Sequence, residues 1–442
     1  MTAPRLLGLF LMAALIAALA AVTAAPAQVK LPIQIKPGFP PTGPAMPKAP
    51  PTIPSTPVPK TPTPSPGTPS SPSGFPSIPS VSGPAGPAAK KDDAKWPKEI
   101  NGKTVETVVK EMRSASDPAV REAAVRTLPL FGPKGREFGG NELVEAMTRD
   151  SDWNVRLAAL SVSPTVLFGF ATSQDAPLAG GVSAIMSMLS SEHMHVRFDA
   201  VGAANAFGVY MRNATSGKVV TVLTSRARES TSWQMRRAAA AALGSVGQGV
   251  QRSEAPDDRE PPDQQTVGAL LDILRQDNCA MVRREAVMSL IALGTVSAAQ
   301  QKKWRADLDS VLAREKDKSV LLWTRTCILE NDPNGVKGNE QHLDAVAKVL
   351  QAPETAGKVE ACQAIAIIGE DAKSKLQDLI DLMNNPKEEP VVVVAAIAAV
   401  STMKSQAKIS LPIVDRFKFS PNEDIRRMAN EASDILSGRK KV

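Results

Sequence analysis

The sequence predicts an all-α fold: an α-solenoid, wound as a right-handed superhelix of about nine helix pairs and preceded by a disordered, Pro-rich segment. Three observations support this class. A turn motif recurs about every 38 residues, stretches with apolar residues at helical spacing flank it, and its polar residues are of the types that begin helices. A period of this length is typical of stacked helix hairpins, in which each unit packs only on its neighbours.

The first element is an N-terminal leader over residues 1–27. Arg5 precedes an apolar run from Leu6 to Val22, and Ala25-Pro26-Ala27 supplies the small residues of a cleavage site. These are the parts of a secretory signal peptide, so we expect cleavage before Gln28 and an exported protein: periplasmic, cell-surface or secreted. An uncleaved signal anchor with the repeats on the exported side is the alternative, and only then is a membrane a partner.

The second element, residues 28–98, is a Pro-rich tether. It holds 21 of the chain's 37 prolines and shows no apolar periodicity. Such a composition cannot bury a core and favours an extended, polyproline-like chain. We therefore expect a disordered tether between the leader and the repeats.

The third element, residues 99–442, is the repeat domain, and its fifth copy shows the pattern of each unit. Val267, Leu270, Leu271 and Leu274 fall on one helical face. After a polar turn at 276–279, a second apolar stripe follows at 282, 286, 290 and 293 and ends at Gly294, a residue type common at helix ends. Each unit is therefore predicted to contain two amphipathic helices.

A basic residue marks the start of the second helix in most copies. The nine marker positions are Arg121, Arg156, Arg197, Arg236, Arg283, Leu321, Lys358, Val393 and Arg426. Copies six to eight depart from the pattern, so the repeat count over 317–420 is the least defined. Asp117, Asp152 and Ser232 stand where a side-chain oxygen can cap the second helix.

The acidic residues of the turns and the basic markers predict a ladder of ion pairs along the stack. The pairs expected are Asp117 with Arg121, Asp152 with Arg156, and Glu192 with Arg197, within one unit or between neighbours. Exposed pairs of this kind contribute about 0 to 1 kcal/mol each, so their role would be to fix register. Arg236, Arg283 and Arg426 complete the predicted ladder.

A two-helix unit of this length, with Asp-x-x-Val-Arg at the turn as in 117–121 and 152–156, resembles the HEAT family, including the HEAT-like repeats of phycobilin lyases. The resemblance covers about residues 99–442. It implies a helical solenoid that serves as a binding scaffold, and it leaves the partner open because such scaffolds bind unrelated proteins.

The distribution of charge argues against a nucleic-acid partner. The net charge of +7 comes from the leader and the Lys-rich tether, because residues 99–442 contain 43 basic and 43 acidic residues. Binding to a phosphate backbone depends on concentrated Lys and Arg, which a balanced domain does not supply. We expect a protein partner and no nucleic acid, and the oligomeric state is not defined.

The position after each helix cap offers a candidate contact surface. Trp153, His193 and Trp233 occupy it in three successive units, where packed helices would place them about 10 Å apart. Exposed aromatic side chains favour interface centres. The alternative is that each ring folds over its turn and shields the end of the neighbouring helix.

The sequence contains no recognisable catalytic or cofactor motif. Cys279, Cys327 and Cys362 are widely separated, and His193 and His195 lack further ligands at a suitable spacing, so neither a disulfide framework, a metal site nor a cofactor is predicted. The sequence is interpreted as an exported, non-enzymatic scaffold that binds a protein along the concave face formed by the second helices. Two alternatives stay open: a HEAT-type lyase or chaperone acting on a modified protein, and a purely structural spacer.

Overall fold

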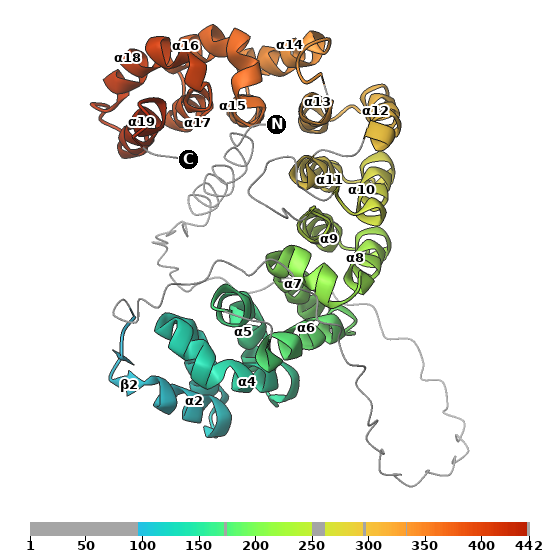
Figure 1. Cartoon of the computed structure of the whole chain (residues 1–442), viewed down its shortest axis with the longest axis vertical. Helices are drawn as coiled ribbons and strands as arrows, with labels where there is room; N and C mark the ends of the chain where they lie inside the picture. The colour runs from blue at the N-terminus through green and yellow to red at the C-terminus, as the bar shows by residue number, and fades with distance from the viewer. Residues whose placement is uncertain (1–95, 172–174, 250–260, 295–297, 333, 440–442) are drawn as a thin grey trace, which may run out of the picture. The chain divides into compact units, whose positions relative to one another are not determined.

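The computed structural model describes residues 96–171, 175–249, 261–294, 298–332 and 334–439, all of which belong to one compact unit (Figure 1). The leader and nearly all of the tether lie outside these residues. Within them the chain forms helix pairs that follow one another along the stack. Their first helices are α2 Val105–Ser114, α4 Pro133–Arg149, α6 Ala176–Leu189, α8 Lys218–Glu229, α10 Gln264–Gln276, α12 Ala298–Leu312, α14 Glu340–Lys348, α16 Leu376–Asn384 and α18 Ala407–Phe417.

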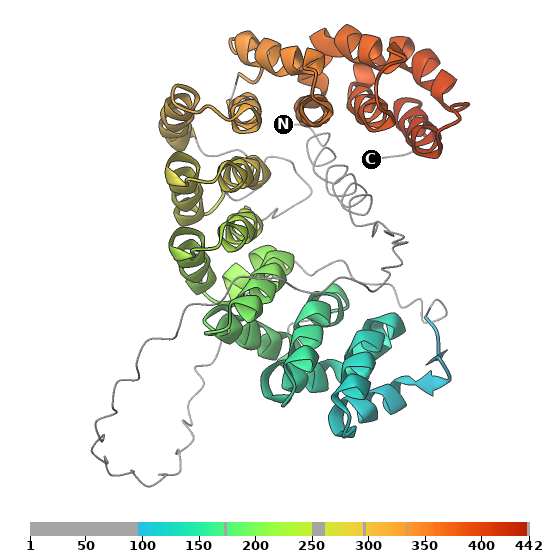
Figure 2. The ribbon, with the colours of Figure 1, turned by 180° about the vertical axis from the view of Figure 1, so that it is seen from behind.

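The second helices alternate with the first and form a row of their own. They are α3 Pro118–Thr127, α5 Trp153–Ser163, α7 Met194–Ala214, α9 Trp233–Val246, α11 Ala280–Leu293, α13 Lys318–Asn331, α15 Thr355–Ile368, α17 Pro390–Ser401 and α19 Glu423–Leu436. Each contacts the second helix of the next unit, and both views show this row beside the row of first helices (Figures 1 and 2). The described residues thus contain nine helix pairs, which confirms the predicted helical-repeat architecture.

Short helical segments complete several units. They are η2 Leu128–Phe131, the π-helical η3 Pro164–Gly169, η4 Val349–Gln351, η5 Gly369–Lys375 and η6 Lys404–Gln406. Among the described residues no single helix has the length and apolar character needed to cross a membrane. One pair bent by 93°, Pro390–Ser401 with Lys404–Phe417, meets that length and composition when taken together.

A small antiparallel hairpin, which the sequence analysis did not predict, precedes the first helix. Strands β1 Glu99–Ile100 and β2 Lys103–Thr104 pair through a turn at Asn101 and Gly102, both with positive φ. Asn-Gly is the residue pair that such two-residue turns favour. Thr104 also caps α2 by accepting a hydrogen bond from the Thr107 amide, so the hairpin leads directly into the first unit.

The turn residues begin the second helices as predicted. The Asp117 and Asp152 carboxylates accept hydrogen bonds from the Ala119 and Asn154 amides at 2.9 and 2.8 Å. Ser232 accepts one from the Met235 amide. Such caps satisfy amide groups that have no partner within the helix, at about 1 kcal/mol each.

Small residues bring the second helices close together. At Gly244 of α9, an added Cβ would lie 2.7 Å from the Ser289 side chain of α11. The Ser289 hydroxyl donates to the Ala240 carbonyl of α9 at 3.0 Å. The core is therefore a continuous apolar seam between the two rows, in which each unit is buried by its neighbours.

One ion pair crosses an entire unit. Arg284 of α11 pairs with Glu360 of α15 at 2.9 Å, although α13 lies between these helices in the stack. Ser319 of α13 donates to the same Glu360 carboxylate at 2.6 Å. Three consecutive second helices are therefore joined at one carboxylate.

The helix α7 is interrupted at Gly208. Its φ of 51° and ψ of −131° are not helical, and the region is one that residues with a Cβ rarely adopt. Phe207 and Tyr210 on either side of the kink contact Phe168 of η3, with ring centroids 5.4 and 5.6 Å away. The kink and the π-helical turn thus meet in one aromatic cluster.

Candidate functional site

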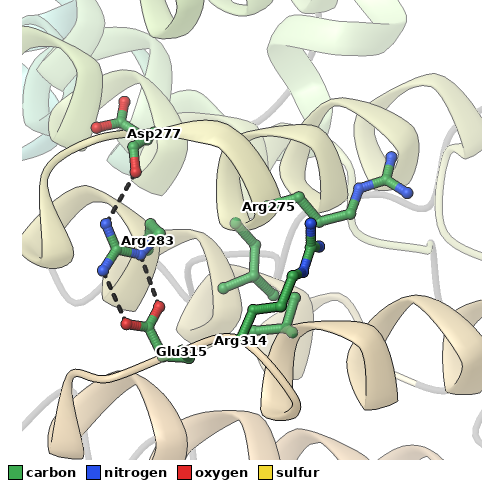
Figure 3. Close-up of a pocket in the computed structure, with 7 residues that line it drawn as sticks. Arg275, Asp277, Arg283, Arg314 and Glu315 are labelled. Carbon is green, nitrogen blue, oxygen red and sulfur yellow. Dashed lines mark hydrogen bonds and ion pairs between the residues drawn. The ribbon is translucent and has the colours of Figure 1, made fainter.

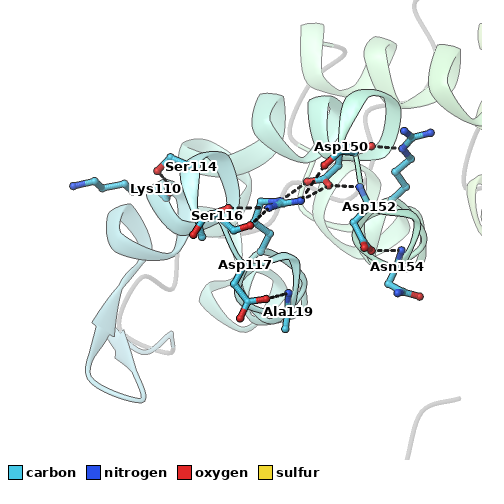
Figure 4. A network of polar contacts seen from close by, with 12 residues as sticks. Lys110, Ser114, Ser116, Asp117, Ala119, Asp150, Asp152 and Asn154 are labelled. Carbon is cyan, nitrogen blue, oxygen red and sulfur yellow. Dashed lines mark hydrogen bonds and ion pairs between the residues drawn. The ribbon is translucent and has the colours of Figure 1, made fainter.

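Three of the marker arginines connect neighbouring turns, but not in the way the sequence analysis predicted. Arg121 donates from Nη1 to the Ala115 carbonyl at 2.8 Å, and from Nε and Nη2 to both carboxylate oxygens of Asp150 at 2.8 Å (Figure 4). Asp150 lies in the turn of the next unit, two residues before the cap Asp152. The acid that binds the arginine is therefore not a cap residue.

The same arrangement recurs in two later units. Arg236 binds Asp277, and Arg283 binds Glu315, each through two nitrogens, with shortest distances of 2.7 Å. Asp277 and Glu315 both stand two residues before the next cap. We call the three pairs Arg121–Asp150, Arg236–Asp277 and Arg283–Glu315 the arginine clasps.

The predicted pairs Asp117–Arg121, Asp152–Arg156 and Glu192–Arg197 are wrong. The Asp117 and Asp152 carboxylates accept from amides of their own helices, and Arg121 extends to the next turn. Glu192 is not a cap, because α7 is capped by His193. Arg156 and Arg197 donate to the carbonyls of Asp150 and Ser191, the carbonyl position that Arg121 uses. Arg197 also donates to the Glu192 carbonyl. The clasp position in their next units is occupied by serines, Ser191 and Ser230, and Arg426 in the last pair donates to the Ser420 and Pro421 carbonyls.

Electrostatics favour the charged form of the clasp carboxylates. The hydrogen bonds from Arg121 hold the pKa of Asp150 below its usual value of 3.8. Burial raises the pKa of Glu315, but the hydrogen bonds from Arg283 and from the amides of Asp317 and Lys316 outweigh it, so that the pKa is lowered. Both carboxylates are largely buried, so the clasps contribute more than exposed pairs do.

One of the three predicted contact residues is displaced by one position. Trp153 and Trp233 are the first residues of α5 and α9, whereas His193 is the cap of α7 and Met194 is its first residue. The turn before α7, residues 190–193, contains one more residue than the turns before α5 and α9. Counting back from Arg197 instead of forward from Glu192 would have found Met194.

The rings near Trp153 partly fit the shielding alternative. The Trp153 and His193 centroids are 4.8 Å apart, well below the predicted spacing of helices, and the Arg156 guanidinium lies 4.4 Å above the Trp153 ring. His195 also packs near Trp153, at 6.3 Å. Trp153 therefore covers the neighbouring turn with one face and keeps part of its surface exposed.

Exposed apolar side chains line the N-terminal ends of four successive second helices. Trp153, Met194, Trp233 and Met281 are 38, 52, 37 and 43% exposed. Trp153, Met194 and Trp233 are the first residues of α5, α7 and α9, and Met281 is the second residue of α11. All four therefore lie in the first turn of helices that contact one another in order, on the turn edge of the stack. We call these four residues the apolar edge.

A pocket of about 190 Å³ opens on the same edge between the fifth and sixth units (Figure 3). It contains the clasp residues Arg283 and Glu315. The full lining comprises Leu274, Arg275, Asp277, Arg283, Val311, Arg314 and Glu315. Three arginines and two carboxylates therefore face one small space.

A second polar cluster surrounds His342, which is only 6% exposed. Its Nε2 lies 3.3 Å from Arg305 and its Nδ1 lies 3.1 Å from Arg325. A neutral imidazole has one acceptor nitrogen, so it can accept from only one of these guanidinium groups at a time. Burial, followed by the charges of both arginines, lowers the pKa of His342.

The cysteines are free thiols, with Cys327 and Cys362 buried and Cys279 half-buried. Burial raises the pKa of both Cys327 and Cys362 to about 12. Within the described ranges, no group of three or more His, Cys, Asp or Glu side chains is placed to hold a metal ion.

Comparison with known proteins identifies the repeat. Residues 140–244 match the family model of HEAT repeats, which confirms the predicted resemblance. An engineered protein of solved structure is 16% identical, with 75% of this chain and 98% of that chain covered and a TM-score of 0.33. Kap121p is 12% identical, with coverage of 75 and 37% and a TM-score of 0.38. No curated protein matches the sequence.

Proposed function

We propose that this chain, a HEAT-repeat protein, is an exported scaffold that binds a protein partner and carries out no chemistry of its own. The observation that supports this best is the apolar edge. Four large apolar side chains occupy the start of four successive second helices and remain more than a third exposed. Side chains of this kind provide the central contacts of protein interfaces, where they bury a large area with few rotatable bonds.

The proposed contact surface is the turn edge of the second helices. The scaffold binds by shape and apolar area, and the clasps hold adjacent turns in register beneath it. Because the units pack only on their neighbours, the spacing of the edge is set by helix packing, at about 10 Å per unit.

Photo-cross-linking of the full chain in its own compartment tests the binding proposal. A benzoylphenylalanine at Met194 is expected to form an adduct with a protein partner, and the adduct should disappear in a Trp153→Ser, Trp233→Ser variant that keeps its helical circular dichroism. The matched control is the same probe at Ile409, an exposed apolar residue of α18. Adducts of equal yield at both positions, or adducts that survive the double substitution, contradict the proposal.

Export is the second part of the proposal and rests on the leader, residues 1–27. Sequencing the N-terminus of the mature protein is expected to give Gln28 as the first residue. A full-length chain that retains Met1 in the cytoplasmic fraction contradicts export and leaves the binding proposal to be judged by cross-linking alone.

A further inference from the structure

We propose that the pocket between the fifth and sixth units receives the carboxylate of an acidic side chain from an extended peptide segment, whose apolar side chains lie on the apolar edge. This inference rests on the proposed scaffold function and specifies the chemistry of the partner. It depends on three features: the uncompensated charge in the pocket, the size of the pocket, and its position next to Met281.

The charge of the pocket is positive because one arginine has no acidic partner. Arg283 is matched by Glu315, and Arg275 donates to Asp272 at 2.5 Å and to Asp307 at 2.7 Å. Arg314 donates only from Nε, to the Ser310 carbonyl at 3.1 Å, and forms no ion pair with any carboxylate of the described residues. The guanidinium of Arg314 is therefore available to an incoming anion.

Arg275 and Arg314 both line the pocket. In Figure 3 the guanidinium of Arg314 points toward the Arg275 side chain. The Nε of Arg275 is buried and has no hydrogen-bond partner. A carboxylate in the pocket would accept from the terminal nitrogens of Arg314, which form no hydrogen bond with any described residue.

The walls and the size of the pocket suit a side chain. Leu274 and Val311 are both buried and supply the apolar part of the lining, on which the methylene groups of an acidic side chain can pack. Sites for small molecules usually enclose about 300 to 1,000 Å³. At about 190 Å³ this pocket is smaller, and it matches a single acidic side chain.

The pocket lies at the same end of α11 as the last residue of the apolar edge. Met281 and the pocket residue Arg283 both belong to the first turn of this helix. Neighbouring helices are about 10 Å apart, and an extended peptide spans about 3.3 Å per residue, so consecutive contacts should fall about three residues apart. The predicted partner motif is a series of apolar residues at this spacing, with an Asp or Glu one step beyond one end.

Selection from a displayed library of random 16-residue peptides tests this motif against the full chain. The selected peptides are expected to combine spaced apolar residues with one terminal Asp or Glu. For a synthetic selected peptide, Arg314→Gln should weaken binding about tenfold, because a charge-assisted hydrogen bond is lost. Replacing the acidic peptide residue with its amide should cause the same loss, and both changes together should add nothing further.

Controls separate the pocket from the edge. Lys348→Gln removes one positive charge from the exposed last turn of α14 and should leave affinity unchanged. Trp233→Ser should weaken the binding of the acidic peptide and of its amide analogue to the same extent.

Two outcomes overturn the inference and leave the scaffold function standing: selected peptides that contain no acidic residue, and peptide binding that Arg314→Gln does not change. Displacement of the peptide by micromolar inorganic phosphate, with its acidic residue dispensable, also overturns it, and failure to select any peptide together with the absence of cross-links overturns both proposals.

Discussion

At the scale of single residues, the clasp arginine is the residue that ties one unit to the next. Arg121 contacts a carbonyl of its own turn and the carboxylate of the following turn, and the exposed fractions of the Arg121 and Asp150 side chains are 12 and 7%. A largely buried pair loses more when one partner is removed than an exposed pair does, because the remaining charge stays desolvated.

Arg121→Met is therefore expected to lower the free energy of unfolding by about 2 kcal/mol at pH 7. The matched control is Arg126→Met on the same helix, which breaks an exposed pair with Glu122 and should cost less than about 1 kcal/mol. Urea unfolding followed by circular dichroism measures both.

Because the folded-state pKa of Asp150 lies below 3.8, its stabilising contribution is present above that pH and is lost as the pH falls through the folded-state value. The difference in free energy of unfolding between Arg121→Met and the wild type should accordingly become smaller in acid. A difference that stays constant from pH 7 to pH 2 argues against the clasp.

A second pH dependence of stability is predicted from His342, which is a basic group, unlike the carboxyl group of Asp150. Its folded-state pKa lies below the ordinary value of 6.5, because it is buried and faces Arg305 and Arg325, while Asp309 and Asp332 oppose the shift. The unfolded chain therefore binds the proton first, and stability falls as the pH drops below 6.5, by at most about 1.4 kcal/mol per pH unit. Denaturant midpoints at pH 7.5 and 5.5 should differ less in His342→Gln than in the wild type. The exposed His195→Gln should retain the wild-type difference, and equal behaviour of the two variants would show that His342 does not titrate in this range.

At the scale of elements, the sequence predicted the second helices well because their start is encoded locally. In every second helix the marker position is the fourth residue, including Leu321 and Val393, where no basic residue is present. Cap chemistry and apolar spacing suffice for this result, because both act within one turn. The carboxylate partner of each clasp arginine lies 29 to 41 residues away and depends on how adjacent units pack, so the assignment to the caps was wrong.

The candidate site was less predictable than the helices. Trp153 and Trp233 were found from their positions, whereas Met194 was missed through the extra turn residue before Arg197. Arg314 gave no signal in the sequence, because its lack of a partner follows from where Arg275, Asp272 and Asp307 are placed. A residue's type is visible in a sequence, but the charges left unpaired after packing are not.

The kink in α7 gives a prediction for an element. Gly208→Ala is expected to destabilise the protein by about 1 to 3 kcal/mol, because alanine is strained at the φ and ψ of this position. Gly202→Ala is the control in the same helix: an added Cβ there meets no atom within 4 Å, so the substitution should stabilise by up to about 1 kcal/mol. Thermal unfolding distinguishes the two. A neutral Gly208→Ala would mean that the helix runs straight through this point.

At the scale of the whole molecule, the stack depends on terminal units that shield its apolar seam. The helix α17 is buried along almost its entire length, and α19 packs against it with a polar outer face. Terminal repeats of solenoids need such a face for solubility.

Deletion of residues 404–442 is expected to uncover α17 and cause self-association. Light scattering coupled to size-exclusion chromatography should show a larger mass per particle than for the full chain at equal concentration. Deletion of residues 437–442, which follow α19, is the control and should leave the mass per particle unchanged. If the longer deletion does not increase the number of chains per particle, α19 is not needed to cover α17.

The carboxylate of Glu360 has a mechanical consequence. In a stack of this kind each joint between units bends on its own, so a pull on the two ends is shared among all the joints as in a spring. Arg284 and Ser319 attach to Glu360 from two successive helices, so separating α15 from α11 or from α13 breaks a contact at the same carboxylate. We therefore expect extension under load to begin at other joints.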